Sequence, residues 1–356
     1  MKTKLLIVDD SRIFRSAIEE SLASENDIEV VGSVWNGVKA IEFIQSNPPD
    51  LVTLDVEMPD MDGLDTLKAI QKINASNIVS KPIGVIMLSS HTQKGADTTV
   101  KALEMGAFDF IPKPEGKDLK ENIEILRRQL VVKIRYFASK RIADPAEPRI
   151  VVPPPSKITP KLTVSSDIKA ILIGVSTGGP RALAEAMPLL CEKVDVPIFI
   201  VQHMPPTFTQ SLAKSLNSKC RYTVMECRDS DIVKERHAYI APGGRHMLLI
   251  KRHKTVRTVV GNQPPENGCK PSVDILFRSG ATVYGKDIIA IVLTGMGVDG
   301  TKGSGILKRA GASIIVQDDK TSVVWGMPGS VKASGNADKV LPLAKIPYAV
   351  VAMMHG

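Results

Sequence analysis

Residues 50–63 read DLVTLDVEMPDMDG, an apolar run that ends at an aspartate and passes into a turn. Four further short apolar runs surround it, at 4–8, 28–32, 83–88 and 108–111. Amphipathic stretches separate these runs, and strands this apolar are typical of a parallel sheet covered by helices on both faces. The first 125 residues therefore predict a (βα)5 domain, in which ligands bind at the carboxyl ends of the strands.

A second series of apolar runs begins at Ile168. Its predicted strands lie at 169–175, 197–202, 237–242, 287–293 and 312–317. This alternation of strands and helical stretches predicts a doubly wound, mostly parallel α/β domain over residues 167–356. The stretch HMLLIKRHKTVRTVV at 246–260 is typical of a β-hairpin, so we expect the second sheet to be mixed.

The segment between the two series has a different composition. A basic helical stretch, RRQLVVKIRYFASKR, is followed by three consecutive prolines at 153–155. Consecutive prolines cannot lie inside a helix or a central strand. We therefore predict two domains, at 1–125 and 167–356, joined by a basic, proline-containing linker at 126–166.

The composition is that of a soluble protein able to bury two cores. Of the 356 residues 43% are hydrophobic, and no apolar run reaches the roughly 18 residues of a membrane span. The opening MKTKLLIVDD places two aspartates where a signal peptide keeps its apolar stretch. The four cysteines form no CxxC pair, which argues against a zinc knuckle and a disulfide framework. We expect a cytoplasmic protein without membrane insertion.

Charge is distributed unevenly along the chain. Residues 1–125 carry 13 basic and 21 acidic side chains, whereas the remaining residues carry 33 and 17. A basic second half fits a nucleic-acid partner or an acidic protein partner. Charge alone does not distinguish these two classes.

Polar side chains stand at the ends of four predicted strands in the first domain, namely Asp9, Asp10, Asp55, Ser89 and Lys113. Because the carboxyl ends of parallel strands meet at one edge of a sheet, we expect these side chains to lie together. Three neighbouring carboxylates repel one another unless a hard cation joins them, and Mg²⁺ is the expected occupant.

A metal beside a carboxylate favours phosphoryl transfer to that carboxylate. Asp55 is the predicted nucleophile, because the loop after it turns and is expected to leave its carboxylate exposed. Lys113 is expected to pair with the phosphate, and the Ser89 hydroxyl is expected to donate to it. The expected metal ligands are Asp55, Asp10, Asp9 and the carbonyl of Glu57.

The first domain resembles the receiver domains of two-component response regulators. The resemblance covers residues 1 to about 125 and rests on Asp9-Asp10, the loop DVEMPDMDG, the strand end LSS and the ending Lys113-Pro114. It implies a flavodoxin-like fold, phosphorylation of Asp55 with Mg²⁺ as cofactor, and a histidine kinase as phosphodonor. It also implies that Phe110 reorients together with Ser89 on phosphorylation.

The motif GVSTGGP at 174–180 follows the first strand of the second domain and opens a helix. It places Ser176 on a strand-to-helix turn resembling a nucleophile elbow, where N–H groups can stabilise an oxyanion. Glycines at 174, 178 and 179 permit a tight turn. A Gly, Ser and Thr loop at a helix start also fits a phosphate cradle, so the motif alone leaves both functions open.

A serine nucleophile needs a base, and the chain has six histidines. His203 directly follows the strand at 197–202, at the same predicted edge as Ser176, and is the preferred candidate. His246 is the second candidate. His253 lies in the basic hairpin, and the other histidines are expected at the surface.

The third member of such a triad is a buried carboxylate that orients the imidazole. Asp299, which follows a strand in a glycine-rich loop, is the preferred candidate. Asp274, at a predicted helix start, is the alternative, and we expect it to cap or to orient. The Met296 N–H is predicted to bind the oxyanion, with a second donor from His203 or Thr177.

With these residues, the second domain resembles the catalytic domain of chemotaxis protein-glutamate methylesterases. The resemblance begins near Ile168 and runs through GVSTGGP, VQHMP, IAPGGRHM, PSVDILFRS, TGMGVDG and QDDKTSVVWGMP. It implies that Ser176 attacks a glutamate methyl ester on a methyl-accepting chemoreceptor, that His203 shuttles the proton, and that Asp299 orients His203. Methanol leaves without a cofactor, and certain receptor glutamines are deamidated at the same site.

The domain order also matches this family. The resemblance implies that the unphosphorylated receiver restricts access to the catalytic cleft and that phosphorylation of Asp55 relieves this restriction. One departure is visible before the motif PSVD, where Cys269 stands at a place expected to hold a histidine. We expect this change to affect substrate affinity rather than chemistry.

Three other functions fit parts of the sequence. A basic second half fits a DNA-binding output domain, but its end has no helix-turn-helix pattern, so we expect no nucleic-acid partner. An α/β-hydrolase esterase shares the GxSxG motif, but its triad follows the order Ser, Asp, His. A catalytically silent docking module would keep the fold without a reactive Ser176.

Overall fold

Residues 2–76, 79–116, 118–142 and 168–355 are described by a computed structural model. The chain divides into two compact units, the first containing β1–β5 and the second containing β6–β14. Most of the proline-containing linker predicted at 126–166 lies outside the described residues, which resume at 168. Among the described residues, no helix combines the length and the apolar character needed to cross a membrane.

The first unit contains a five-stranded parallel sheet with the order β2-β1-β3-β4-β5. Its strands are β1 (Thr3–Val8), β2 (Ile28–Val34), β3 (Leu51–Asp55), β4 (Gly84–Ser89) and β5 (Asp109–Pro112). Each of them overlaps one of the predicted apolar runs. The (βα)5 prediction is confirmed.

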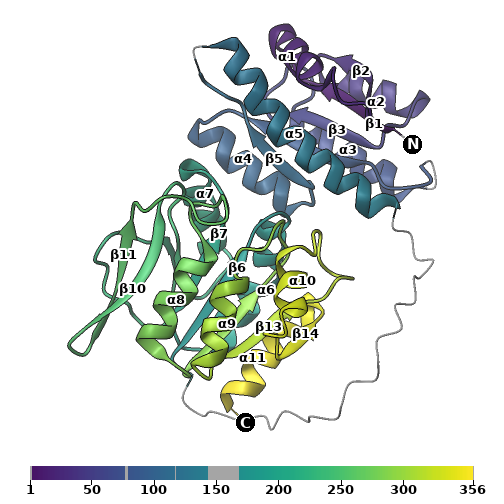
Figure 1. Ribbon diagram of the computed structural model, residues 1–356. Helices are drawn as coiled ribbons and strands as arrows, with labels where there is room; N and C mark the ends of the chain where they lie inside the picture. Colours follow the sequence, from purple (N-terminus) through teal and green to yellow (C-terminus); the bar gives the residue numbers. More distant parts are fainter. Residues whose placement is uncertain (1, 77–78, 117, 143–167, 356) are drawn as a thin grey trace. The chain divides into compact units, whose positions relative to one another are not determined.

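The helices of the first series are α1 (Arg12–Leu22), α2 (Gly37–Ser46), α3 (Gly63–Ala75), α4 (Gln93–Glu104) and α5 (Leu119–Ile142). Helix α1 packs beside α5 and helix α2 beside α3 (Figure 1). The first four helices each begin after a polar residue whose side-chain oxygen accepts an N–H of the first turn, namely Ser11, Asn36, Asp62 and Thr92. Such caps satisfy backbone donors that a helix start leaves unpaired.

Helix α5 continues past residue 125, where we placed the end of the first domain. It runs to Ile142 and includes the basic stretch that we predicted to be helical but assigned to the linker. Arg135 donates to Asp27 at 2.7 Å, and Arg141 lies 3.1 Å from Asp50. The basic side chains thus pair with acidic residues of the first unit, which are distant in sequence.

The second unit contains a seven-stranded sheet with the order β14-β13-β12-β6-β7-β9-β8, and all its strands are parallel. The strands are β6 (Ala170–Val175), β7 (Ile198–Gln202), β8 (Thr223–Glu226), β9 (His237–Ile240), β12 (Ile288–Val292), β13 (Ser313–Gln317) and β14 (Lys339–Leu341). The predicted doubly wound α/β class is confirmed.

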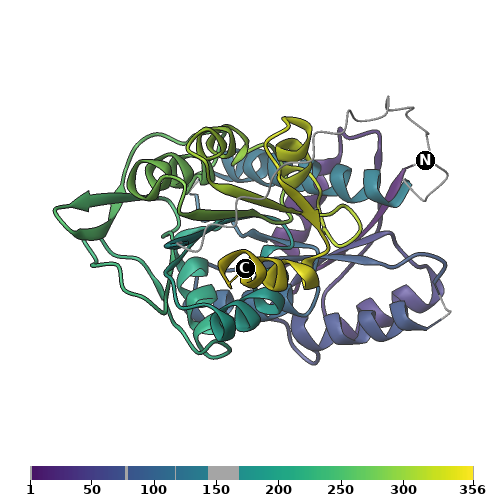
Figure 2. The ribbon, with the colours of Figure 1, turned by 90° about the horizontal axis from the view of Figure 1, so that it is seen from below.

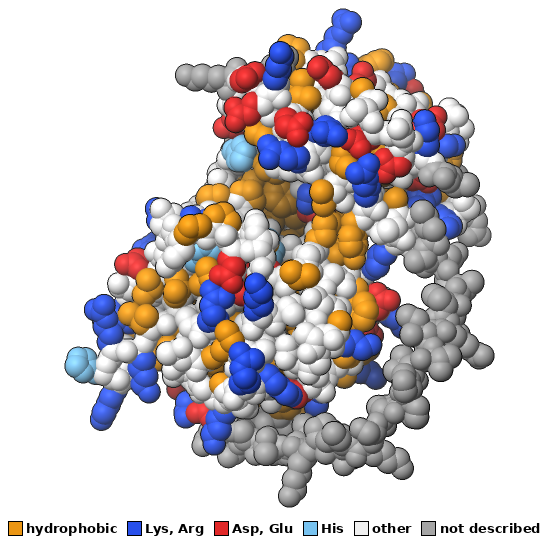
Figure 3. Space-filling model, viewed as in Figure 1, with side chains coloured by type: hydrophobic (Ala, Val, Ile, Leu, Met, Phe, Trp, Pro, Cys, Tyr) orange, Lys and Arg blue, Asp and Glu red, His pale blue; other side chains and the backbone are white. Residues whose placement is uncertain are grey.

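The predicted hairpin is present, but the prediction of a mixed second sheet is wrong. Strands β10 (His246–Arg252) and β11 (Thr255–Gly261) pair antiparallel in a two-stranded sheet of their own. Met247 and Leu249 of β10 are buried beside the helix α8 (Val273–Tyr284), so the hairpin covers a helix instead of extending the main sheet. Basic side chains stand out at the hairpin tip, at the lower left of Figure 3.

Helices cover both faces of the seven-stranded sheet (Figure 2). Besides α8, they are α6 (Gly179–Lys193), α7 (Pro206–Asn217), α9 (Thr301–Arg309), α10 (Met327–Ala333), the short 3₁₀ helix η1 (Leu343–Lys345) and α11 (Ile346–His355). The core between the layers includes Leu172, Phe199, Tyr239 and Phe277, each at most 2% exposed. Burial of such large side chains is the main term that stabilises the unit.

Strand β6, the first of the second unit, lies in the middle of the sheet. Strand β7 flanks it on one side and β12 on the other, so the chain leaves β6 in both directions. In open α/β sheets a ligand binds outside the carboxyl ends of the strands at such a switch point. The topology therefore predicts a ligand site at the loops after β6, β7 and β12.

Candidate active site

Ser176 is the first residue after β6. Its N–H donates to the Thr294 carbonyl after β12 at 3.0 Å, and the His203 N–H after β7 donates to the Val175 carbonyl at 3.3 Å. Backbone hydrogen bonds therefore hold the loops after these three strands side by side.

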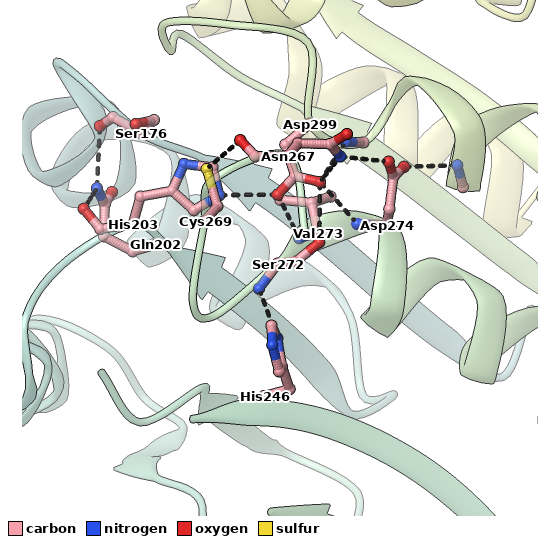
Figure 4. Close-up of polar contacts among 12 residues, drawn as sticks. Ser176, Gln202, His203, His246, Asn267, Cys269, Ser272, Val273, Asp274 and Asp299 are labelled. Atoms are coloured by element: carbon pink, nitrogen blue, oxygen red, sulfur yellow. Dashed lines mark hydrogen bonds and ion pairs between the residues drawn. The ribbon is translucent and has the colours of Figure 1, made fainter. Parts of the chain in front are cut away.

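The turn after Ser176 has the geometry that the glycines of GVSTGGP predict. Gly178, the N-cap of α6, has a φ of 78°, a conformation that side-chain-bearing residues rarely adopt. The Gln202 side chain donates to the Ser176 carbonyl at 3.0 Å and holds the turn from the neighbouring strand (Figure 4). The sequence analysis missed Gln202, although an amide at the end of the apolar run IFIV was a signal for it.

The loop after β12 touches Ser176 directly. A Cβ at Gly295 would lie 2.8 Å from the Ser176 Cβ and 2.5 Å from the Met327 Sδ, so only glycine fits there. Met296 follows, and within the described part of the chain its N–H has no hydrogen-bond acceptor. Thr177, the other predicted oxyanion donor, is buried, and its carbonyl accepts from the Thr294 hydroxyl at 2.9 Å.

His203 and Asp299 form a hydrogen-bonded pair, with Nε2 of His203 2.9 Å from Oδ2 of Asp299 (Figure 4). The two side chains are 13% and 1% exposed. Since Nε2 faces the carboxylate, Nδ1 is the ring nitrogen left for a serine, the reverse of the serine protease arrangement. Among the described residues the Ser176 hydroxyl makes no hydrogen bond to His203, and such contacts commonly tighten only when substrate binds.

The Asp299 carboxylate is held by the start of α8. It accepts the Val273 N–H at 2.7 Å, the Asp274 N–H at 3.2 Å and the Ser272 hydroxyl at 2.9 Å. Burial raises the pKa of Asp299, but hydrogen bonds from His203 and from these N–H groups lower it by more, so the pKa falls to about 2. Asp299 is therefore an anion at neutral pH.

The same pair affects the imidazole. Burial lowers the pKa of His203, but the Asp299 carboxylate and the Cys269 sulfur raise it by more, to about 9. The site thus stabilises the imidazolium that a general base becomes after it accepts a proton.

The two second candidates, His246 and Asp274, hold the surroundings of this pair. His246 is fully buried, and its Nδ1 accepts the Ser272 N–H at 3.1 Å. One Asp274 oxygen accepts the Gly303 N–H in the first turn of α9 at 2.6 Å. Each therefore fixes a segment that contacts Asp299. The sequence analysis missed Ser272, which links His246 to Asp299.

A tight turn brings Cys269 into the site. Glu266 and Cys269 exchange backbone hydrogen bonds of 3.1 and 2.9 Å around Asn267 and Gly268, whose φ angles of 53° and 73° are those of a type I′ turn. The Asn267 amide, also missed from the sequence, donates to Asp299 at 3.1 Å. The Cys269 Sγ lies within 4.8 Å of donor atoms of His203 and Asp299, whereas we expected the change at this position to affect substrate affinity rather than chemistry.

The first unit holds a second polar cluster at the carboxyl edge of its sheet. Carboxylate oxygens of Asp9, Asp10 and Asp55 lie within 4.8 Å of one another. The Lys113 Nζ lies 2.7 Å from Oδ2 of Asp9 and 2.8 Å from Oδ2 of Asp55. Lys113 thus bridges two of the three carboxylates.

The expectation that the Asp55 carboxylate is exposed is wrong. Its side chain is 6% exposed, because it lies beside Asp9 and Lys113 instead of projecting into the loop. Burial and the Asp9 charge raise the pKa of Asp55 to about 6, although Lys113 opposes them. A set of oxygen donors with two buried members, which resists full ionisation, suits a hard dication such as Mg²⁺.

The remaining predicted residues of the first unit are Ser89, Phe110 and Glu57. Ser89 ends β4, is buried, and its carbonyl accepts the Lys113 N–H at 2.7 Å. Phe110 is buried in β5, and Glu57 is exposed in the loop after β3. The positions of their side chains relative to a phosphate stay predictions.

Comparison with known proteins identifies both units. The response regulator receiver domain family matches residues 5–124, and the CheB methylesterase family matches residues 171–350. The chain belongs to the CheB methylesterase family. The receiver domain lies N-terminal to the methylesterase domain, as the sequence predicts, and receiver domains of this kind normally bind Mg²⁺.

Relatives match nearly the whole chain. A protein-glutamate methylesterase/protein-glutamine glutaminase of Trichodesmium erythraeum (strain IMS101) is 43% identical over 354 residues, covering 98% of both chains. One of Pyrococcus horikoshii is 40% identical and covers 98% of this chain and 93% of the relative. The crystal structure of the Thermotoga maritima CheB methylesterase catalytic domain is 43% identical, with a TM-score of 0.51, and covers 52% of this chain and 98% of that one. The predicted family and enzyme class are confirmed.

Proposed function

We propose that this protein hydrolyses glutamate methyl esters and deamidates glutamines on chemoreceptors, through Ser176, His203 and Asp299. The observation that carries the proposal is the 2.9 Å pair of His203 and Asp299 beside the Ser176 turn. The substrate class comes from the names of the relatives, which are protein-glutamate methylesterases and protein-glutamine glutaminases. The predicted role in chemotaxis adaptation is part of the same proposal.

Acylation begins when the Ser176 hydroxyl attacks the ester carbonyl. His203 accepts the hydroxyl proton at Nδ1, and the Asp299 anion stabilises the imidazolium. The N–H groups of Met296 and Thr177, at the glycine-rich loop and the start of α6, are proposed to bind the oxyanion. When the tetrahedral intermediate collapses, the C–O bond to the methoxy group breaks and His203 returns the proton, so methanol leaves.

Deacylation repeats these steps with water. His203 takes a proton from the water, the oxygen attacks the acyl carbon, and the bond to Ser176 breaks with the proton returned to the hydroxyl. The product is a glutamate carboxylate. With glutamine as substrate the same acyl-enzyme forms and ammonia leaves in place of methanol.

The receiver domain is proposed to regulate this activity through phosphorylation of Asp55 by a histidine kinase. Asp55, Asp9, Asp10 and the Glu57 carbonyl would hold Mg²⁺, which when bound neutralises charge on the phosphoryl oxygens. Lys113, already 2.8 Å from Asp55, would pair with the phosphate. Ser89 and Phe110 are proposed to reorient in response.

The test is methanol release from membranes that carry methylated chemoreceptors. We expect Ser176→Ala to abolish release, and a fluorophosphonate that labels the wild type to leave this variant unlabelled. Asp55→Asn should keep basal release and lose only its stimulation by a small-molecule phosphodonor. Full release by Ser176→Ala would refute the hydrolase mechanism, and stimulation retained in Asp55→Asn would refute the regulatory part.

A further inference from the structure

Cys269 adds a third kind of metal ligand to the His203–Asp299 pair. A ring nitrogen of His203, the Sγ of Cys269 and a carboxylate oxygen of Asp299 all lie within 4.8 Å of one another. Figure 4 shows the Cys269 sulfur against the His203 ring. We infer that these three side chains form a Zn²⁺ site and that Zn²⁺ bound there inhibits the enzyme.

The donor set selects the kind of metal. One sulfur, one imidazole nitrogen and one carboxylate oxygen suit Zn²⁺, whereas Mg²⁺ and Ca²⁺ prefer oxygen ligands alone. A thiolate and a carboxylate together balance the charge of the dication, and the imidazole binds in its neutral form. Three protein ligands leave the fourth tetrahedral position to water.

The spacing is close to that of a zinc site. Tetrahedral Zn²⁺ with these ligands holds the donor atoms about 3.3–3.6 Å apart. His203 Nε2 and Asp299 Oδ2 are already 2.9 Å apart, and all three donors lie within 4.8 Å. The remaining displacement is about 1 Å at most, which rotation of the partly exposed Cys269 side chain provides.

The backbone that carries Cys269 is fixed before any metal arrives. The type I′ turn holds Cys269 against Glu266, and Arg278 clamps Glu266 with two contacts of 2.6 Å. Asn267 in the same turn donates to Asp299 at 3.1 Å. Partners that orient the ligands in this way commonly strengthen metal binding about 10- to 100-fold.

Metal binding and catalysis exclude each other at this site. As the S–Zn and N–Zn bonds form, the Cys269 thiol and the Nε2 of the His203 imidazolium each release a proton to solvent. The bound nitrogen no longer connects the imidazole with Asp299, and the neutral ring keeps its remaining proton on Nδ1. His203 then cannot serve as the base for Ser176. The inhibition rests on the proposed hydrolase function, whereas the binding of the metal does not.

Metal binding is tested with Co²⁺, a spectroscopic substitute for Zn²⁺, on the full chain carrying Ser176→Ala. We expect one equivalent of Co²⁺ to give a thiolate-to-cobalt charge-transfer band that Zn²⁺ abolishes. Adding Cys269→Ala should remove the band, and adding Cys220→Ala, at another partly buried thiol of the same domain, should keep it. No band, or a band that persists without Cys269, would overturn the site.

Inhibition is tested by methanol release from methylated receptor membranes at increasing Zn²⁺. The wild type should lose activity and regain it with a chelator, and Asn267→Gly should need about 10- to 100-fold more Zn²⁺. Cys269→Ala, measured against its own activity without metal, should resist still higher concentrations. Equal sensitivity of the wild type and Cys269→Ala would refute the inhibition. A wild type without esterase activity would refute the proposed function and leave the cobalt result standing.

Discussion

Asp55 and Asp299 are both buried aspartates at the carboxyl edge of a parallel sheet, but their environments shift their pKa values in opposite directions. Asp55 has another carboxylate as its neighbour, and its pKa rises to about 6. Asp299 accepts hydrogen bonds from His203 and the start of α8, and its pKa falls to about 2. Burial raises the pKa in both cases, so the neighbours decide the outcome.

The difference corresponds to two kinds of chemistry. A carboxylate that is hard to ionise is stabilised as an anion when a metal cation binds beside it, and the same cation neutralises charge on an incoming phosphoryl group. A carboxylate that is already stabilised as an anion orients and stabilises a neighbouring imidazolium without reacting itself. The two aspartates share a position at the edge of a sheet, but the charged groups and hydrogen-bond donors around them differ. These neighbours determine which chemistry each carboxylate suits.

The largest expected effect tests Asp299. Asp299→Asn should lower kcat about 10³- to 10⁴-fold, because an amide neither fixes the imidazole tautomer nor stabilises its cation. The neighbouring Asp274→Asn is the control, and we expect a change below about tenfold because the amide oxygen can still accept from Gly303. Steady-state methanol release measures both, and equal losses would show that Asp299 has no special part in catalysis.

The second prediction concerns the pH dependence of the esterase. A base with a pKa of about 9 is mostly protonated at pH 7, so kcat/KM should rise about tenfold per pH unit below that pKa. The Cys269 sulfur contributes to the raised pKa, and Cys269→Ala should therefore move the rise toward lower pH. Rates measured with a chelator present test this, and a profile that stays in place in Cys269→Ala would remove the sulfur from the explanation.

The third prediction tests close packing at the nucleophile. Gly295→Ala adds a methyl group where the Ser176 Cβ is 2.8 Å and the Met327 Sδ 2.5 Å away. Overpacking of this kind costs about 1–3 kcal/mol, and we expect a lower free energy of unfolding together with a lower kcat. Gly305→Ala, in α9 where the nearest atom is the end of the Asn336 side chain at 3.2 Å, is the control for a glycine change without a severe clash. Unchanged kcat in Gly295→Ala would separate this loop from catalysis.

The smallest effect concerns the stability of the receiver domain. The pKa of Asp55 rises from 3.8 to about 6 on folding, so without metal the folded state binds the proton more tightly and stability falls as the pH rises from about 4 to about 6. At pH 7 Asp55→Asn should therefore raise the free energy of unfolding by up to about 3 kcal/mol. Urea titration with a chelator measures this. An exposed control is Asp10→Asn, and a larger gain from that variant would contradict the assignment.

Much of the fold followed from local sequence patterns. The apolar runs such as KLLIV and KAILI predicted the strands, and the polar residues that end them predicted which edge holds the sites. The strand order was not predictable, nor was the separation of the β10–β11 hairpin from the main sheet. Both depend on which surfaces the finished core covers. The helical character of the basic stretch in α5 was predicted, but not that it belongs to the first domain, because its Arg135 and Arg141 pair with acidic residues far away in sequence.

Residue type and position at a strand end were enough to predict the main members of the candidate sites, but not the side chains that hold them. Ser176, His203 and Asp299 each follow a different strand. These three strands, β6, β7 and β12, are neighbours in the sheet, which brings His203 to Asp299. The partners of Asp299 were missed because Asn267 and Ser272 act through side-chain hydrogen bonds that no spacing reveals. The burial of Asp55 was missed because the turn after it was taken to leave its carboxylate exposed, whereas Lys113 and Asp9 lie against it.

The strand order also determines when a growing chain becomes able to react. Strand β6 with its serine is made early in the second unit, but its neighbour β12, which leads to Asp299, is made more than a hundred residues later. Contacts this distant in sequence carry a loop-closure cost that slows folding. A partly synthesised or truncated chain therefore carries the serine without the means to activate it, and esterase activity reports completion of the whole domain.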